Sequence, residues 1–231
     1  MALADDIRAE VKDILNTSWK ERDGQKVPEA EDVKLGNDAV KLAGTVLYAD
    51  LAESTSMVNG YKNWFAAEMY KAFLLSACRI IRDQGGTITA FDGDRVMAVF
   101  IGDGKNSAAA RAGLKINHAV LKIINDEVAK KYTTNPFVMK HAVGIDTCDL
   151  FVARTGIRGS NDLVWVGRAA NYAAKMCSLR SGNYATWITD TVYSFLNDEA
   201  KYASNGTCMW EEKKWNAYNM TVYASTWMWA P

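Results

Sequence analysis

Two apolar segments of this chain each end in carboxylates, and that arrangement constrains the fold more than any other feature of the sequence. Residues 45–49 lead to Asp50, which a small polar turn and a helical pattern follow. Residues 86–100 form two β-prone runs around Asp92-Gly93-Asp94, a sequence typical of a hairpin turn. If these strands are neighbours, Asp50 and Asp94 can hold one or two divalent cations against a nucleoside triphosphate.

Composition excludes several classes of protein. With 231 residues and 49% hydrophobic content, the chain can bury the core of one domain with appendages. Its 27 basic and 27 acidic residues balance, so we expect no nucleic-acid binding and no attraction to an anionic membrane surface. No apolar stretch has the length of a membrane span and the N-terminus is acidic, so we predict a cytoplasmic protein. The four cysteines lack metal-site spacing and are predicted to be buried thiols.

The N-terminal part differs from the rest of the chain. Residues 1–20 have a helical apolar stripe, and residues 21–32 have the composition of a polar linker. We therefore predict an N-terminal helix and linker over 1–35 and one domain over 36–231. The helix could be an oligomerisation arm, a lid or a packed extension.

Hydrophobic periodicity predicts an α+β fold in the remaining sequence. The order is βαββαβ with extra strands, which favours a ferredoxin-like core, with an antiparallel sheet and helices on one face. The predicted elements are a strand at 41–50, a helix at 60–83, a hairpin at 86–92 and 95–101, a helix at 105–131, strands at 138–145, 150–154 and 163–167, a helix at 168–180 and a terminal αβ tail.

A third cluster of functional side chains lies where the strand at 163–167 passes into a helix. Arg168, Asn171 and Lys175 are spaced i, i+3 and i+7, so all three project from one helix face. Two cations and an amide at the end of a strand favour a functional role over a solvated surface.

These clusters together resemble the catalytic domain of class III nucleotidyl cyclases over about residues 41–190. The resemblance depends on three motifs in the expected order. They are Ala49-Asp50 with Ser54-Thr55, the hairpin from Gly85-Gly86 to Gly93-Asp94, and Gly144-Ile145 followed by Val166-Gly167 and Asn171.

The resemblance implies a two-metal active site shared between subunits. Asp50, Asp94 and the backbone carbonyl of Leu51 would bind two divalent cations, Mn²⁺ or Mg²⁺. The protein would form an antiparallel homodimer with composite active sites, in which the helix at 168–175 comes from the other subunit. Asn171 would orient the ribose, and Lys175 would stabilise charge at the α-phosphate where the family usually has arginine.

Other positions bear on the substrate. Ser54 and Thr55 follow Asp50 in the turn expected to bind phosphate oxygens. The positions that read adenine or guanine in the family carry Ala90 and Arg168 here, so neither purine-reading pair is present. Arg168 offers only donors, which suits the carbonyl oxygens of uracil, and Tyr48, like Trp165, could narrow the pocket against a purine.

This pattern resembles the pyrimidine cyclases of bacterial anti-phage systems. By that resemblance we expect UTP to be converted to cyclic UMP, with CTP to cyclic CMP second, as a second messenger for a separate effector protein. The alternative is a non-catalytic cyclase-like module that binds nucleotide. A diguanylate cyclase is excluded because Gly85-Gly86 is not followed by acidic residues. Glu53 could bind metal or face solvent, and Lys213 or Lys214 could reach the triphosphate or lie in a solvated turn.

Overall fold

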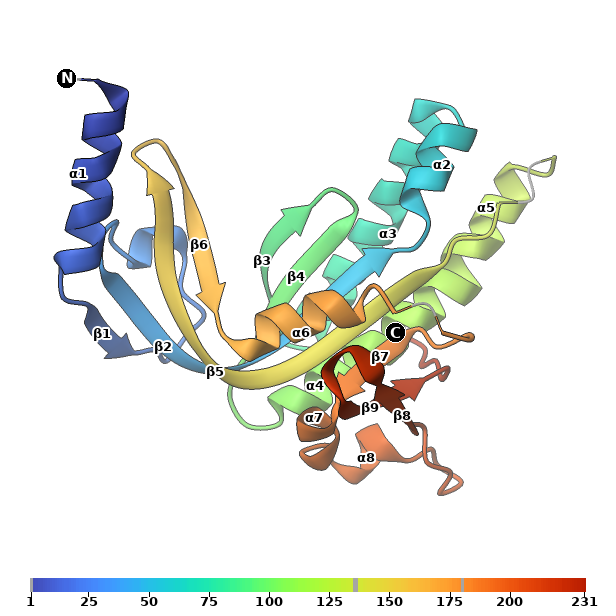
Figure 1. Ribbon diagram of the computed structural model, residues 1–231. Helices are drawn as coiled ribbons and strands as arrows, with labels where there is room; N and C mark the ends of the chain where they lie inside the picture. Colours follow the sequence, from blue (N-terminus) through green and yellow to red (C-terminus); the bar gives the residue numbers. More distant parts are fainter. Residues whose placement is uncertain (1, 135–136, 180) are drawn as a thin grey trace. The chain divides into compact units, whose positions relative to one another are not determined.

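The computed structural model describes residues 2–134, 137–179 and 181–231 (Figure 1). The chain divides into two compact units. The first contains the chain up to Ala43 together with Asp149–Gly167, and the second contains Gly44–Cys148 and Arg168–Pro231. Every side chain predicted for the active site lies in the second unit except Trp165, which lies in the first. None of the helices in the described part is long and apolar enough to cross a membrane.

The second unit is built on a sheet with the strand order β3-β4-β2-β5-β7-β9-β8. β2 pairs antiparallel with β4, and β4 pairs antiparallel with β3, whereas β5 and β7 pair parallel. The strands are β2 (Asp38–Leu51), β3 (Thr87–Asp92), β4 (Arg95–Phe100), β5 (His141–Ile157), β7 (Thr186–Thr189), β8 (Glu211–Trp215) and β9 (Met220–Ser225).

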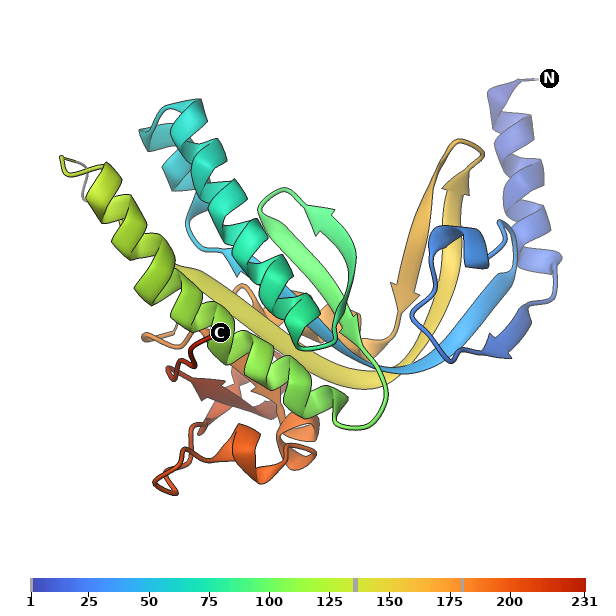
Figure 2. The same cartoon turned by 180° about the vertical axis from the view of Figure 1, so that it is seen from behind.

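Two long helical segments cover one face of this sheet, as Figure 2 shows. They are α3 (Asn63–Asp83) and the continuous run of α4 (Lys105–His118), the π-helix η2 (Ala119–Ile124) and α5 (Asn125–Lys131). Apolar residues recur every three or four positions along α3, which gives the helix one buried stripe. The buried members of that stripe are Phe65, Ala66, Met69, Phe73, Ala77, Ile80 and Ile81.

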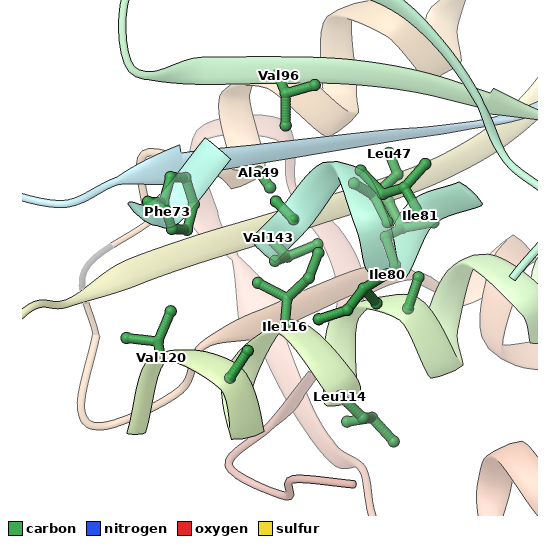
Figure 3. Packing of buried hydrophobic residues seen from close by; sticks show 14 of the residues in the cluster. Leu47, Ala49, Phe73, Ile80, Ile81, Val96, Leu114, Ile116, Val120 and Val143 are labelled. Atoms are coloured by element: carbon green, nitrogen blue, oxygen red, sulfur yellow. The ribbon is translucent and has the colours of Figure 1, made fainter. Parts of the chain in front are cut away.

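The main core lies between these helices and the sheet (Figure 3). Leu47, Ala49 and Leu51 of β2 are buried in it. Because strand side chains alternate between faces, Tyr48 and Asp50 point to the opposite face. The helix side of the sheet therefore supplies stability, and the other side is available for chemistry.

Helix α6 (Arg168–Met176) packs on that other face. A Cβ atom at Gly144 of β5 would lie 2.2 Å from the backbone oxygen of Ala173, so only glycine lets the helix approach so closely. Met176 continues this contact into a second core cluster with Trp187 and Trp215. The shorter helices of the second unit are α2 (Ser54–Gly60), α7 (Asp190–Ser194), α8 (Asp198–Lys201) and the 3₁₀ turn η3 (Asn216–Tyr218).

The first unit combines the N-terminal segment with the outer ends of β2 and β5. It contains α1 (Leu3–Asn16), β1 (Lys20–Asp23), the 3₁₀ turn η1 (Ala30–Asp32) and β6 (Ser160–Val166). β1 pairs parallel with β2, and β6 pairs antiparallel with β5. The segment predicted as a polar linker therefore includes a short strand. No residue of α1 is buried, so its apolar stripe is exposed.

The predicted fold class is confirmed, and the structure adds three details. One helix, α6, covers the face opposite the others, and the β5–β7 pair is parallel. The strands predicted at 138–145 and 150–154 are one strand, β5. Two polar residues in the gap between the predicted strands are buried and bonded: Asp146 accepts from Arg168 and Thr189, and the Thr147 hydroxyl donates to the Gly44 carbonyl oxygen at 3.2 Å.

Candidate active site

The two residues predicted to bind metal lie at the same end of two neighbouring strands. Asp50 is the penultimate residue of β2, and its register partner on β4 is Arg95. Asp94 directly precedes Arg95 in the turn between β3 and β4. The antiparallel pairing of β2 with β4 therefore places Asp94 one residue from the position opposite Asp50.

Asp94 has the property expected of a cation ligand. Its Oδ2 atom is buried and has no hydrogen-bond partner among the residues that the structure describes. A buried carboxylate oxygen without a partner is costly, and a positive ion restores the lost interaction. The carboxylates and the Leu51 carbonyl at the end of β2 are hard oxygen donors, which suit Mg²⁺ or Mn²⁺.

The protein alone provides few ligands at this position. Within the described ranges no cluster of three or more His, Cys, Asp or Glu side chains could hold a metal ion. A cation bound by Asp50 and Asp94 would therefore complete its coordination with phosphate oxygens or water, which is typical of Mg²⁺ at nucleotide sites.

Arg95 supplies a positive charge beside these carboxylates. Its Nη2 atom donates to Asp92 Oδ2 at 2.6 Å. Burial opposes the charge of the guanidinium, but the bond to Asp92 and the charge of Asp50 outweigh burial and raise the pKa of Arg95. Arg95 thus remains charged, and it lies 5.4 Å from the ring centre of Tyr48.

Tyr48 lies on the same sheet face as Asp50. The ring is half-buried, and burial raises the pKa of the Tyr48 phenol, so this residue is a neutral group at physiological pH. Ala90 is a half-buried residue of β3 and pairs with Met97, directly after a register shift between Ile88 and Ala90. Ala90 contributes no polar group to base recognition.

The turn after Asp50 has an unusual backbone. Glu53 adopts a left-handed conformation (φ 60°) and precedes α2, which begins at Ser54. Ser54 is half-buried and Thr55 is exposed at the start of this helix, where backbone amides lack intrahelical partners. The Glu53 carboxylate lies 3.7 Å from the Lys140 ammonium, so it faces a lysine at the surface.

Arg168 is held by a buried carboxylate. Asp146 Oδ2 accepts from Arg168 Nε at 3.0 Å, and Asp146 Oδ1 accepts from Arg168 Nη2 at 3.2 Å. The Asp146 side chain is fully buried, and Thr189 donates a third bond to it at 2.6 Å. Nη2 also approaches the Thr147 carbonyl oxygen at 3.2 Å and the Thr191 hydroxyl at 3.4 Å.

This arrangement leaves one amino group of Arg168 for a ligand. Nη1 makes no hydrogen bond to any described residue, while the guanidinium remains partly exposed. No role could be assigned to Asp146 or Thr189 from the sequence, because each bonds a residue more than twenty positions away along the chain. The signal that could have found Asp146 is a carboxylate that directly follows the apolar run 142–145, in a segment otherwise suited to burial.

Asn171 and Lys175 are both exposed on α6. The Lys175 ammonium donates a hydrogen bond to the hydroxyl of Tyr218, in the turn between β8 and β9. The structure thus brings together Asp50, Asp94, Arg95 and Tyr48 at one place, and presents Asn171 and Lys175 on the outer side of a helix.

Several secondary expectations can be compared with the structure. Lys213 is half-buried and donates to Glu211 at 3.0 Å. The expectation of buried thiols is confirmed for Cys177, whereas Cys78 and Cys148 are half-buried. It is wrong for Cys208, which is exposed because it lies in the loop before β8.

Solved structures with the same fold are nucleotide cyclase domains. No family model matches the chain. The crystal structure of the guanylyl cyclase Cya2 superposes with a TM-score of 0.67 at 19% identity, covering 83% of this chain and 95% of that one. The adenylyl cyclase CyaB from P. aeruginosa also gives 0.67, at 20% identity, covering 81% of this chain and 95% of that one. The fold is that of a class III cyclase domain.

Curated relatives define the family more narrowly. The chain is 55% identical to a uridylate cyclase of Xanthomonas perforans over 231 residues, covering 99% of both chains. It is 53% identical to a uridylate cyclase of Burkholderia cepacia, again with 99% of both chains covered. A uridylate cyclase of Rhodovulum sp. (strain MB263) is 42% identical, covering 98% of this chain and 97% of the relative. The chain belongs to the uridylate cyclase family, and the resemblance to pyrimidine cyclases is confirmed.

Proposed function

We propose that this protein converts UTP to cyclic UMP and pyrophosphate, with CTP as a poorer substrate. The observation that carries the proposal is the pair Asp50 and Asp94 at the end of neighbouring strands, with one carboxylate oxygen buried and unpartnered. The full-length similarity to uridylate cyclases supports the choice of base.

The proposed reaction is an in-line displacement within one nucleotide. The ribose 3′-hydroxyl oxygen forms a bond to the α-phosphorus, the bond from that phosphorus to the pyrophosphate oxygen breaks, and the hydroxyl proton is lost to solvent. Such a reaction requires mainly positioning and neutralisation of charge.

Asp50, Asp94 and the Leu51 carbonyl would hold two divalent cations, Mn²⁺ or Mg²⁺. When bound, these ions lower the pKa of the attacking hydroxyl and neutralise the triphosphate. The chain itself would grip the phosphates with backbone amides around Ser54 and Thr55 at the start of α2.

Asn171 and Lys175 would act on the ribose and on the α-phosphate. Because both are exposed on α6, they are accessible to a second copy of the chain. We propose an antiparallel homodimer whose two active sites each combine metal ligands of one subunit with α6 of the other. A monomer would then be inactive.

Recognition of the base would depend on Arg168. Its Nε and Nη2 atoms donate to Asp146, which leaves the Nη1 donors for the base. These donors favour a base that presents carbonyl oxygens. Uracil presents two such oxygens, whereas the exocyclic amine of cytosine would face a donor. Tyr48 would restrict the space for a purine, and Ala90 leaves the purine-reading position without a polar group.

We further propose that cyclic UMP is a second messenger in anti-phage defence that a separate effector protein senses. Nucleoside triphosphates form a cytoplasmic pool, and we therefore propose the cytoplasm as the place of action.

The test is an activity assay with purified protein, Mn²⁺ and each of the four nucleoside triphosphates separately. We expect cyclic UMP as the main product, less cyclic CMP, and background levels from the purines. Product from none of the four would refute the enzyme and favour a cyclase-like module that only binds nucleotide. A dominant purine product would refute the role given to Arg168.

A further inference from the structure

Lys175 has one hydrogen-bonding partner in the part of the chain that the structure describes, and that partner is Tyr218. The ammonium donates to the phenolic hydroxyl, and Nζ lies 4.8 Å from the centre of the ring. The nitrogen is therefore nearer to the hydroxyl oxygen than to the ring centre. The hydroxyl, more than the aromatic face, is the group that contacts Lys175.

Tyr218 itself is fixed by aromatic packing. Its ring centre lies 4.4 Å from that of Trp215 and 5.1 Å from that of Tyr172, and Tyr172 and Trp215 are 5.5 Å apart. Trp215 is buried at the end of β8, and Asn219 closes the turn in a left-handed conformation (φ 47°). We call Tyr172, Trp215 and Tyr218 the aromatic triad; it connects α6 to the turn between β8 and β9.

A lysine needs such support more than an arginine would. Arginine presents a rigid planar fork, whereas lysine carries a compact charge on a flexible four-carbon stem. A neutral hydroxyl accepts one hydrogen bond from the ammonium and leaves the full charge and two further N–H donors for phosphate oxygens. An acidic partner would instead cancel that charge.

We propose that Tyr218 is a positioning residue for cyclisation, which holds the Lys175 ammonium through its hydroxyl so that lysine can replace the fork of arginine. The inference rests on the proposed function, because Lys175 is assigned there to the α-phosphate. It goes beyond that function by adding a residue from a distant hairpin to the same site.

The test compares Tyr218→Phe with the unchanged protein in steady-state kinetics with UTP and Mn²⁺. The substitution keeps the ring and removes the hydroxyl, so we expect kcat to fall about threefold to tenfold while KM changes less than about twofold. Tyr193→Phe is the matched control: the Tyr193 ring centre also lies 4.8 Å from a lysine Nζ, that of Lys201, but its hydroxyl contacts Cys208 Sγ and not a residue of α6. We expect its kinetics to equal those of the unchanged protein.

A double-mutant cycle separates positioning from general support of the fold. In a Lys175→Met background, Tyr218→Phe should have no further effect on kcat, because its only proposed action is through Lys175. In a Lys175→Arg background, Tyr218→Phe should lower kcat less than it does with Lys175, because the rigid guanidinium fork depends less on a positioning partner. An equal loss of kcat in all three backgrounds would overturn the proposal and assign Tyr218 a purely structural role.

The outcomes for the two proposals are distinct. If the unchanged protein makes no cyclic nucleotide, the proposed function fails. If it makes cyclic UMP and Tyr218→Phe retains full kcat, only the positioning role of Tyr218 fails.

Discussion

Replacement of Asp146 by asparagine tests how Arg168 selects the base. Asp146 is fully buried and accepts three hydrogen bonds, two from Arg168 and one from Thr189. Asparagine keeps the shape but has one oxygen, so its amide nitrogen must face either Nε of Arg168 or both Nη2 of Arg168 and the hydroxyl of Thr189. The substitution therefore removes a charge and at least one bond, and it frees the guanidinium to rotate.

The expected loss of stability is moderate. Breaking a fully buried ion pair costs about 3–5 kcal/mol, but the freed Arg168 side chain is 44% exposed and can bind water. We therefore expect the free energy of unfolding to fall by about 2 kcal/mol, the value for a hydrogen bond to a charged group. Urea denaturation followed by circular dichroism measures this change.

We expect the substitution to lower kcat/KM more for UTP than for CTP. With Arg168 no longer fixed, its donors lose their alignment with the uracil oxygens but can also move away from the cytosine amine. We expect the ratio of kcat/KM for UTP over CTP to fall about tenfold, equivalent to about 1.4 kcal/mol. Asp83→Asn is the control, because Asp83 is a carboxylate that bonds Lys115 at the surface. It should change neither stability nor selectivity measurably. An unchanged ratio in a folded Asp146→Asn protein would show that Arg168 does not read the base.

Three further predictions concern the metals, the dimer and the packing of α6. Asp94→Ala should abolish turnover, and adding Mn²⁺ with UTP should no longer raise the melting temperature. Without ligands the variant should be as stable as the unchanged protein or more stable, because an unpartnered buried oxygen is removed. A lower melting temperature of the ligand-free variant would contradict this. Mixing Asp50→Ala with Asn171→Ala should restore activity to the extent that heterodimers form, each with one complete site, and zero activity in the mixture counts against composite sites. Gly144→Ala should lower the free energy of unfolding measured in urea by about 1–3 kcal/mol, because the added Cβ overlaps a backbone oxygen. An unchanged free energy of unfolding would disprove that contact.

The sequence was informative where local pattern and chemistry agree. The hairpin at 86–101 and the strand before Asp50 could be predicted because turn residues and β-prone runs are local signals, and their pairing follows from the fold class. The helix predicted at 168–180 is present as α6, which ends earlier, at Met176, but its side of the sheet could not be predicted. That side depends on Gly144, which carries no side chain and therefore no hydrophobic signal.

The supporting residues of the site were missed for a related reason. Asp146 is buried only because Arg168 and Thr189, which lie more than twenty positions further along the chain, bond to it. Tyr218 is near Lys175 only because the turn between β8 and β9 approaches α6. Neither relation leaves a periodic pattern in the sequence. The roles of Asp50, Leu51, Asp94, Asn171 and Lys175, like the boundary predicted at residue 35, stay predictions.

The contact at Gly144 also restricts how this enzyme could be redesigned. Backbone meets backbone there, so no side chain can be trimmed or enlarged to raise or lower α6 by a fraction of an ångström. Mutational libraries aimed at new substrates would gain nothing at that position. Variation would have to come from the residues that bond side chains at the two ends of α6, Asp146 at its start and Tyr218 near its end. Substitutions there change the positions of individual side chains without moving the helix.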